Sequence, residues 1–377
     1  MNKIEIYVHI PFCVRKCLYC DFLSGEIRGG EDEVRTYIDA LCREIELKRD
    51  MAEDHEVSSV FFGGGTPSCI DAKHIWRVME CIRMNYRICP DAEITIEANP
   101  RTLDANKLKT YRMMGINRIS LGAQSFKDDE LQNLGRIHNA DQIRQSVDLI
   151  KDAGFENFNI DLMMAIPGQD FDSYKSTLEE AVSLEPKHIS AYSLIIEPGT
   201  KFYDIYGDGD KPCGCADSSA ELSQAALLPD EDTERDMYHY TVKYLKENGY
   251  DQYEISNFSK PGFECDHNIG YWVRREYLGF GLGAASLVGN KRFSELTGDE
   301  ELDERDCMSE TMILGLRMNA GVGKEEFKAT YNKDIYDVYG REIKSLVDQG
   351  LLIDDRENIY LSERGFDLAN YAFGYFI

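Results

Sequence analysis

The sequence predicts an α/β fold: an open partial (β/α)6 barrel followed by a small helical, winged-helix-like C-terminal domain. Six short β-like runs alternate with amphipathic helical patterns through the first half of the chain, a pattern typical of parallel strands joined by right-handed crossovers. A helical region followed by a short hairpin near the end suggests the winged-helix shape. The chain has 377 residues, which is enough for a barrel-sized domain and a smaller one.

The six expected strands are bounded by apolar and β-branched residues and are followed in turn by helical patterns. They cover residues 4–10, 57–62, 93–98, 117–121, 157–163 and 188–195. The expected helices cover residues 31–51, 71–87, 102–114, 139–153 and 171–184. Such units build either a doubly wound sheet or a barrel, and six in series after an N-terminal cysteine loop favour an open barrel. Functional residues should then gather at the C-terminal ends of the strands.

The second half of the chain divides by composition. We expect a barrel domain at 1–290, with a surface insertion at 201–232, a helix at 233–248 and an extension at 233–290 that carries the motif His-Asn-x-x-Tyr-Trp. An acidic linker at 291–306 leads to the C-terminal domain at 307–377, with helices from Ser309 and a hairpin at 350–361. The Cys213/Cys215 pair in the insertion is interpreted as incidental, because no further ligands accompany it.

Charge and composition exclude several classes of protein. The 42 basic and 68 acidic residues give a net charge of −26, which would repel a phosphate backbone and argues against nucleic-acid binding. No stretch approaches the roughly 18 consecutive apolar residues of a membrane span. The start MNKIEIYVHI has no signal-peptide pattern, so we expect a cytoplasmic protein whose eleven cysteines are free thiols or metal ligands.

Three cysteines follow the first expected strand within eight residues: Cys13, Cys17 and Cys20. This spacing predicts three thiolate ligands to one iron–sulfur cluster. Zinc is the alternative metal, but it would usually require a fourth Cys or His, and none follows at close spacing. A four-iron cubane held by three thiolates keeps one iron without a protein ligand, as reactive metal sites do.

Other polar or glycine-rich motifs also follow strands and should meet the cysteines at one mouth. Gly63-Gly64-Gly65-Thr66-Pro67 follows the second strand, where bare backbone could approach an amino-acid-like ligand. Glu97 and Asp161 could accept hydrogen bonds from ribose hydroxyls, with structural carboxylates as the alternative. Gln124 could add amide hydrogen bonds. Arg136 could bind a carboxylate bidentately, with an exposed arginine at a helix start as the alternative.

These motifs occur in the order found in radical SAM proteins and resemble the oxygen-independent coproporphyrinogen III oxidase group over nearly the whole chain. The matching segments are Tyr-Val-His-Ile-Pro-Phe-Cys, Gly-Gly-Gly-Thr-Pro-Ser, Ile-Glu-Ala-Asn-Pro, Leu-Gly-Ala-Gln-Ser-Phe, Leu-Gly-Arg-Ile-His and Asp-Leu-Met-Met-Ala-Ile-Pro-Gly-Gln. The resemblance implies a 4Fe-4S cluster on Cys13, Cys17 and Cys20 whose fourth iron is chelated by S-adenosylmethionine (SAM). It also implies the residues that hold SAM: Tyr7, Tyr19, Gly64, Gly65, Thr66, Glu97, Gln124, Arg136 and Asp161.

Within this group the chain is most similar to the HemW branch of haem chaperones. The true oxidases have a Cys-x-Cys ending to the cluster motif and an N-terminal extension, whereas here Asp21 follows Cys20 and only twelve residues precede Cys13. The segment from Tyr253 to Trp272 carries the branch's His-Asn-x-x-Tyr-Trp signature. The resemblance implies haem-accepting client proteins, an electron donor such as a flavodoxin or ferredoxin, and membrane association only at the periphery through clients.

His267 is the residue of this signature that could contact haem, with Tyr271 and Trp272 as aromatic surface, and a structural histidine is the alternative. Where the family usually has Gly-Ala-His-Ser, this chain reads Gly283-Ala284-Ala285-Ser286, which removes one imidazole. Two rival functions remain. One is a porphyrin-modifying radical enzyme, such as the oxidase itself, that cleaves SAM reductively to a 5′-deoxyadenosyl radical. The other is a non-catalytic interaction protein stabilised by its cluster.

Overall fold

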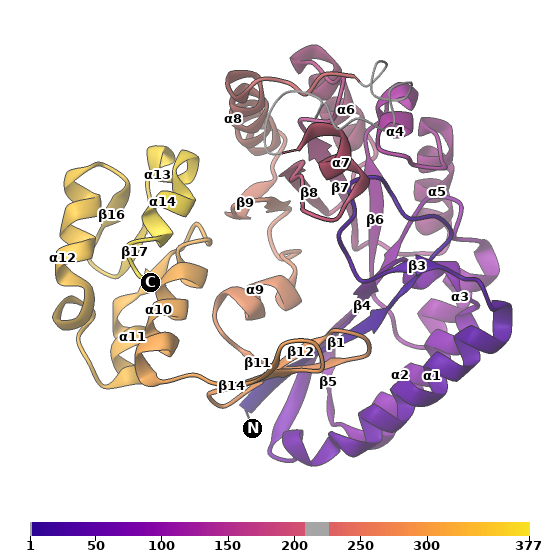
Figure 1. The fold of residues 1–377 in the computed structure, drawn as a ribbon, viewed down its shortest axis with the longest axis horizontal. Helices are drawn as coiled ribbons and strands as arrows, with labels where there is room; N and C mark the ends of the chain where they lie inside the picture. The colour runs from indigo at the N-terminus through magenta and orange to yellow at the C-terminus, as the bar shows by residue number, and fades with distance from the viewer. Residues whose placement is uncertain (1, 208–225) are drawn as a thin grey trace.

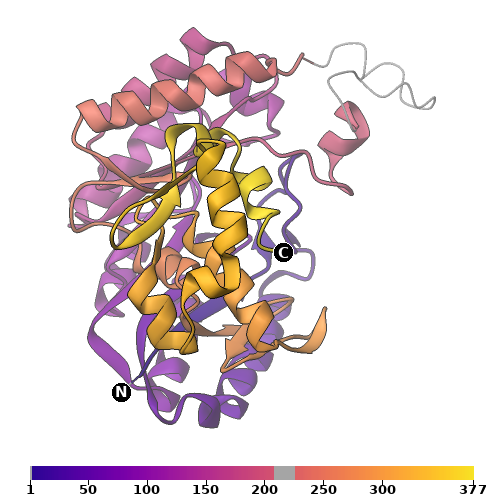
Figure 2. The same ribbon diagram turned by 90° about the vertical axis from the view of Figure 1, so that its left-hand side faces the viewer.

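The computed structural model describes residues 2–207 and 226–377, so Cys213 and Cys215 lie outside the described residues. Its main feature is one strongly curved sheet with helices on the outer side and a separate C-terminal unit beside its open edge (Figures 1 and 2). In the described part of the chain, no helix is long and apolar enough to cross a membrane.

Six parallel strands form the centre of the sheet, and they confirm the six strands expected from the sequence. In sheet order they are β1 (Asn2–Ile10), β4 (His55–Gly64), β5 (Ile88–Ala98), β6 (Arg118–Gln124), β7 (Phe158–Met164) and β8 (His188–Ser193). Neighbouring pairs are parallel throughout, as right-handed crossovers require. All six carboxyl ends therefore meet at one mouth.

Helices cover the outer face of these strands, and their buried apolar residues form one continuous core with the strands. They are α1 (Gly30–Leu47), α2 (Ala72–Asn85), α3 (Ala105–Met113), α4 (Asp128–Asn133), α5 (Ala140–Asp152), α6 (Phe171–Ser183) and α8 (Glu231–Glu247), with short 3-10 turns η1 (Arg49–Ala52) and η2 (Pro67–Cys69). Side chains mark several starts: Asp104 accepts from two backbone N–H groups of α3, and Asn139 forms a capping box with Gln142.

The sheet continues beyond the six expected strands at both edges. β11 (Glu276–Phe280) lies parallel to β1, followed by the antiparallel strands β12 (Ala285–Val288), β13 (Lys291–Ser294) and β14 (Gly298–Glu301). At the other edge, β10 (Asn257–Ser259) pairs antiparallel with β8, and β9 (Asp251–Glu254) pairs antiparallel with β10.

The segment 291–306, expected to be a linker, therefore contains two strands and the start of a helix. Every residue of β14 is exposed, so this hairpin lacks the apolar alternation by which a strand is recognised in a sequence. The domain boundaries at 290 and 307 remain a prediction.

Four smaller elements lie near the mouth or inside the curve of the sheet. β2 (Phe12–Cys13) and β3 (Gly25–Glu26) pair within the cysteine loop, and α7 (Lys201–Tyr206) begins the expected insertion. α9 (Asp266–Trp272) packs against β4 inside the curved sheet and against α10 of the C-terminal unit.

The C-terminal unit has its own apolar core and combines helices with a small antiparallel sheet, as a winged helix does. Its elements are α10 (Glu304–Gly315), β15 (Val322–Gly323), α11 (Lys324–Tyr331), α12 (Ile335–Asp348), β16 (Leu352–Asp354), β17 (Asn358–Leu361), α13 (Glu363–Asp367) and α14 (Ala369–Phe373). β16 and β17 confirm the expected hairpin. α10 begins five residues before the expected start at Ser309.

Candidate functional site

The cysteine loop lies directly against the glycine loop, as expected for two segments that follow adjacent strands. Gly65 N donates to Ile10 O at 2.9 Å, and Thr66 N donates to Phe12 O at 2.7 Å. A Cβ atom on Gly65 would lie 2.5 Å from Phe12 O, so only glycine allows this close approach. On the other side, Leu18 N donates to Leu134 O at 3.1 Å. The loop is therefore held from the end of β4 on one side and from the end of α4 on the other.

The three thiols of the loop are free and differ in burial. Cys13 is buried, whereas Cys17 and Cys20 are half-buried. Burial raises the pKa of Cys20, and the neighbouring Cys17 and Cys13 raise it further. Among the described residues, no group of three His, Cys, Asp or Glu side chains is arranged to hold a single metal ion. A cubane spaces its thiolates more widely, because each one binds a different iron atom.

Half-exposed side chains on otherwise buried central strands line the inside of the curved sheet. They are Tyr7, Phe61, Glu97, Asp161, Ser190 and Tyr192. A Cβ atom on Gly63 would lie 3.1 Å from both Glu97 Oε2 and the Tyr7 ring, so the glycine leaves room where these side chains converge. We call this space the barrel interior.

Glu97 and Asp161 are the two acidic residues of this interior. Glu97 Oε2 accepts from Gly64 N at 3.2 Å, and its enclosed position raises its pKa to about 8, helped by the nearby Asp161. Asp161 Oδ1 accepts from Asn159 Nδ2 at 2.6 Å, and desolvation raises the pKa of Asp161 as well. Hydrogen bonds donated by ligand hydroxyls would stabilise the charged form of these desolvated carboxyl groups. The pair therefore suits the two hydroxyls of a ribose.

Gln124 and Arg136 are both fixed by hydrogen bonds near the mouth. Gln124 ends β6 with a φ of 70°, and its Oε1 accepts from Tyr192 OH at 2.8 Å. Arg136 donates to Tyr19 OH at 2.9 Å and to Asn99 Oδ1 at 2.7 Å. The structure therefore places Arg136 in a half-buried network rather than at an exposed helix start, and it brings Tyr19 into contact with it.

His267 lies inside the barrel, on α9. Its ring stacks on Phe61 with centroids 4.9 Å apart and lies 6.4 Å from the ring of Tyr7. Nδ1 shares a hydrogen bond with Ser59 Oγ at 2.9 Å and lies 3.5 Å from Glu5 Oε2. Burial lowers the pKa of His267 to about 3, so the imidazole is neutral at physiological pH. Within the described residues, Nε2 has no hydrogen-bond partner.

The two aromatic residues of the same motif have different surroundings. Tyr271 is 42% exposed and stacks on Tyr277 with centroids 4.9 Å apart. Trp272 is half-buried, and the guanidinium of Arg317 lies 4.4 Å from its ring centroid. Tyr271 therefore offers accessible aromatic surface, while one face of Trp272 already has a partner.

Ala285, which stands where the family usually has histidine, lies at the start of β12. It packs against an apolar cluster formed by Tyr277, Leu287, Leu302 and Cys307. This cluster faces the C-terminal unit.

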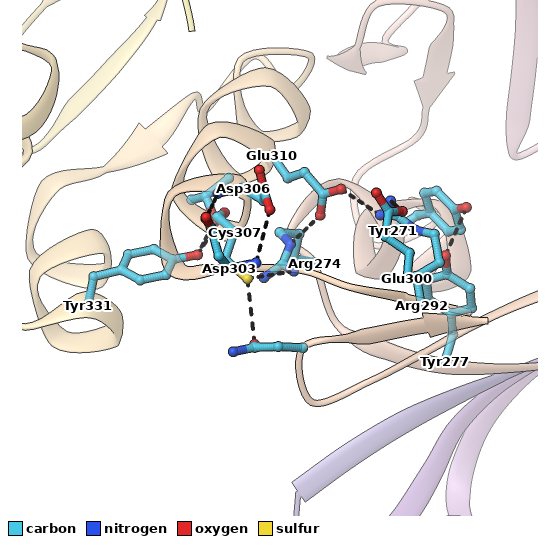
Figure 3. Close-up of polar contacts among 12 residues, drawn as sticks. Tyr271, Arg274, Tyr277, Arg292, Glu300, Asp303, Asp306, Cys307, Glu310 and Tyr331 are labelled. Carbon is cyan, nitrogen blue, oxygen red and sulfur yellow. Dashed lines mark hydrogen bonds and ion pairs between the residues drawn. The ribbon is translucent and has the colours of Figure 1, made fainter. Parts of the chain in front are cut away.

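Polar contacts join α9, the C-terminal unit and the hairpin of β13 and β14 at the sheet edge, here called the edge hairpin (Figure 3). Glu310 on α10 accepts from Arg274 Nε at 2.8 Å and from Arg292 Nη2 at 2.6 Å. Arg274 follows α9 and Arg292 lies on β13, so one carboxylate connects the two segments. The adjacent Arg275 points into the sheet, where Nη1 donates to Glu5 at 2.7 Å and to Asp266 at 2.9 Å. Arg274 therefore connects the end of α9 to the C-terminal unit, and Arg275 connects it to the central sheet.

Sequence reasoning missed three residues that organise this region. Asn99 bridges Arg136 and Thr66, Glu93 accepts hydrogen bonds from the start of α9, and buried Glu5 contacts His267. Asn99 lies in the Glu-Ala-Asn-Pro motif and could have been found there. Glu5 and Glu93 are charged residues within buried strand patterns, which is the available signal for them.

Two family models match the chain: the radical SAM superfamily at residues 7–181 and the HemN C-terminal domain at residues 302–368. Curated relatives named heme chaperone HemW match at nearly full length. The protein of Lactococcus lactis is 36% identical, covering 98% of this chain and 96% of the relative. That of Bacillus subtilis is 33% identical, covering 98% of both chains, and that of Escherichia coli is 32% identical, covering 97% and 96%.

Among solved structures, coproporphyrinogen III oxidase (HemN) from Escherichia coli, described as a radical SAM enzyme, has a similar fold. The TM-score is 0.83, with 24% sequence identity, over 100% of this chain and 90% of the other. This likeness concerns the fold alone.

Proposed function

We propose that this chain, which belongs to the HemW haem chaperone family within the radical SAM superfamily, binds a 4Fe-4S cluster, SAM and haem and delivers haem to other proteins. The observation that supports the proposal is the position of His267. The signature helix α9 directs this imidazole into the barrel interior beside Tyr7. A haem held there would lie next to the SAM residues.

The residues present fit a cluster and SAM. Cys13, Cys17 and Cys20 would hold the cluster, because the loop offers three free thiols at the mouth of the barrel. Gly64, Gly65, Thr66 and Arg136 would face the amino-acid part of SAM, Glu97 and Asp161 its ribose, and Tyr7, Tyr19 and Gln124 would complete the enclosure. One-electron reductive cleavage of SAM is the chemistry that such a cluster supplies when it is bound.

The protein's own groups would position and enclose these ligands. The glycine loop leaves its backbone accessible, Gln124 is fixed by Tyr192, and Arg136 is fixed by Tyr19 and Asn99. Neutral His267 Nε2 would face the haem iron, since Nδ1 is already bonded to Ser59, and Tyr271 would offer aromatic surface. Haem-accepting clients and an electron donor such as a flavodoxin or ferredoxin complete the proposal.

The end of the cluster motif favours haem delivery over porphyrinogen oxidation. The oxidase branch ends its cluster motif in Cys-x-Cys, whereas in this chain the exposed Asp21 follows Cys20 and Phe22 stands where the second cysteine of that pattern would fall. The phenyl ring of Phe22 offers no ligand atom, so the thiol at that position of the oxidase motif is missing here.

The cluster assignment is tested by anaerobic reconstitution of the wild type and of Cys17→Ala. We expect about four irons and four sulfides per chain in the wild type and loss of the cluster in the variant. Full iron and sulfide content in Cys17→Ala would contradict the assignment. Cys89→Ala, which alters a thiol outside the loop, is the matched control.

The haem assignment is tested by optical titration of the reconstituted protein with haem. We expect His267→Ala to weaken haem binding at least about tenfold, equivalent to about 1.4 kcal/mol, and to change the Soret band. His239→Ala, which alters a surface histidine paired with Asp367, should behave as wild type. Unchanged affinity and spectrum in His267→Ala, with an unchanged melting temperature, would exclude His267 as the iron ligand.

A further inference from the structure

We propose that Asn99 is a positioning residue that forces the hydroxyl of Thr66 to donate a hydrogen bond to the sulfur of Cys13, and that this bond raises the reduction potential of the cluster. The inference rests on the proposed function in one respect, namely that Cys13 is a cluster ligand. It adds a hydrogen-bond chain that starts and ends in the cysteine loop.

The chain has four links, each within hydrogen-bond distance. Arg136 Nη2 donates to Tyr19 OH at 2.9 Å, and Arg136 Nη1 donates to Asn99 Oδ1 at 2.7 Å. Asn99 Nδ2 donates to Thr66 Oγ1 at 2.7 Å, and Thr66 Oγ1 lies 3.7 Å from Cys13 Sγ. Thr66 and Cys13 are both buried, so water does not compete strongly for the last link.

The direction of the hydrogen bonds between Arg136 and Cys13 follows from the guanidinium of Arg136. A guanidinium can only donate, so the atom of Asn99 that meets Arg136 must be the carbonyl oxygen. The amide nitrogen of Asn99 therefore points to Thr66 and donates to it. Because Thr66 Oγ1 already accepts this hydrogen bond, its own hydrogen is left to donate to the sulfur of Cys13.

The backbone on both sides keeps these side chains in place. Thr102 Oγ1 donates to Asn99 O at 2.7 Å, and Thr102 N donates to the same oxygen at 3.1 Å. Thr66 N donates to Phe12 O, and Cys69 N donates to Thr66 O at 2.8 Å. The backbones of Asn99 and Thr66 are thus both held in place by hydrogen bonds, which fixes where the two side chains begin.

A hydrogen bond to a ligating sulfur favours the more negative, reduced form of the cluster. Hydrogen bonds to the sulfurs are among the factors that set the reduction potentials of iron–sulfur clusters. Loss of the Thr66 donor should therefore shift the midpoint potential to more negative values. The shift should follow from any substitution that turns the hydroxyl away, even if Thr66 itself is kept.

The test is a redox titration of the anaerobically reconstituted full-length protein without SAM, followed by electron paramagnetic resonance. Thr66→Val removes the donor at nearly constant volume, and Thr66→Ser restores it. Asn99→Asp keeps the contact with Arg136 but cannot donate to Thr66, so the hydroxyl turns to the carboxylate. We expect a negative shift in Thr66→Val and Asn99→Asp, and a potential near wild type in Thr66→Ser.

The double variant separates positioning from the added charge of the aspartate. If Asn99 acts through Thr66, Asn99→Asp adds clearly less in the Thr66→Val background than in the wild type. An equal shift in both backgrounds, or no shift in Thr66→Val, would overturn the proposal. Thr110→Val, on the exposed face of α3, is the control expected to match the wild type.

A second measurement needs no variant to keep its cluster. Electron–nuclear double resonance of the reduced wild type should detect an exchangeable proton coupled to the cluster, and the signal should disappear in D2O. Absence of such a proton would overturn the proposal. Failure of the wild type to assemble a four-iron cluster would instead contradict the proposed function, so the two failures are distinguishable.

Discussion

Glu97 carries the clearest electrostatic signature among the single residues of the site. Its ordinary pKa of 4.5 rises to about 8 in the folded protein, mainly because the enclosed position disfavours the charged form. The folded state therefore binds this proton more tightly than the unfolded state does. Stability from this group is present below pH 4.5 and is lost as the pH rises from 4.5 towards 8.

Substitution of Glu97 by glutamine should remove this pH dependence, because Gln resembles the protonated acid. We expect Glu97→Gln to stabilise the ligand-free protein by up to roughly 4 kcal/mol at pH 8 and by less at pH 5, while SAM binding weakens. Urea unfolding at the two pH values measures the first effect and calorimetry measures the second. Equal stability changes at both pH values would contradict the assignment, and Glu156→Gln on the surface is the control.

The sequence allowed most individual residues of the site to be placed, and the reason is geometric. Residues that follow parallel strands meet at one edge of the sheet, so Glu97, Gln124 and Asp161 could be expected near the cysteines. Asn99 could not be assigned its role in this way. Its hydrogen bonds join side chains from three separate segments, and no strand pattern determines which atom of an amide faces which partner.

At the scale of elements, α9 is the segment on which the proposed haem site depends. This helix has seven residues and is held at its start by a distant side chain. Glu93 on β5 accepts from Asp266 N at 3.3 Å and from His267 N at 3.4 Å, and it also accepts from the thiol of Cys265. A carboxylate at a helix N-terminus accepts hydrogen bonds from the free N–H groups and interacts favourably with the positive end of the helix dipole.

Removal of this carboxylate should loosen α9 without touching the haem ligand itself. We expect Glu93→Ala to destabilise the protein by about 1–2 kcal/mol and to weaken haem binding, as measured by urea unfolding and optical titration. Asp91→Ala, an exposed residue on the same strand, should change neither property. The cap has no such role if both quantities in Glu93→Ala match those of the wild type.

The six parallel strands were predictable because their apolar runs alternate with amphipathic helices. The antiparallel strands at the sheet edges were not. β9 and β10 have only four and three residues, and β14 is wholly exposed. Short or solvated edge strands are stabilised by pairing with a sheet that already exists, so their own sequence carries little of the signal.

At the scale of the whole molecule, the C-terminal unit is joined to the sheet through α9, the edge hairpin and β9. Glu310 binds both Arg274 and Arg292 (Figure 3). Arg317 lies over the ring of Trp272. Backbone hydrogen bonds from Ile255 N to Arg317 O and from Asn319 N to Tyr253 O add a direct connection to β9. We expect movement of the C-terminal unit to be transmitted to the signature helix.

Loss of Glu310 should weaken this junction, because two partly buried arginines would lose their common partner. We expect Glu310→Ala to cost about 1–3 kcal/mol and to increase hydrogen exchange in α9 and α10 while the central strands stay protected. Glu300→Ala removes a more exposed partner of Arg292 and should have little effect. Unchanged exchange in α9 would show that the junction does not support the helix.

The central claim is that this chain binds haem for delivery and does not convert a porphyrinogen. One anaerobic incubation tests it most directly: the reconstituted protein with SAM, a reductant, haem and coproporphyrinogen together, followed by separation and analysis of the bound and free porphyrins. The account predicts about one haem retained per chain and unchanged coproporphyrinogen. Catalytic decarboxylation of coproporphyrinogen, with no haem retained, would contradict it.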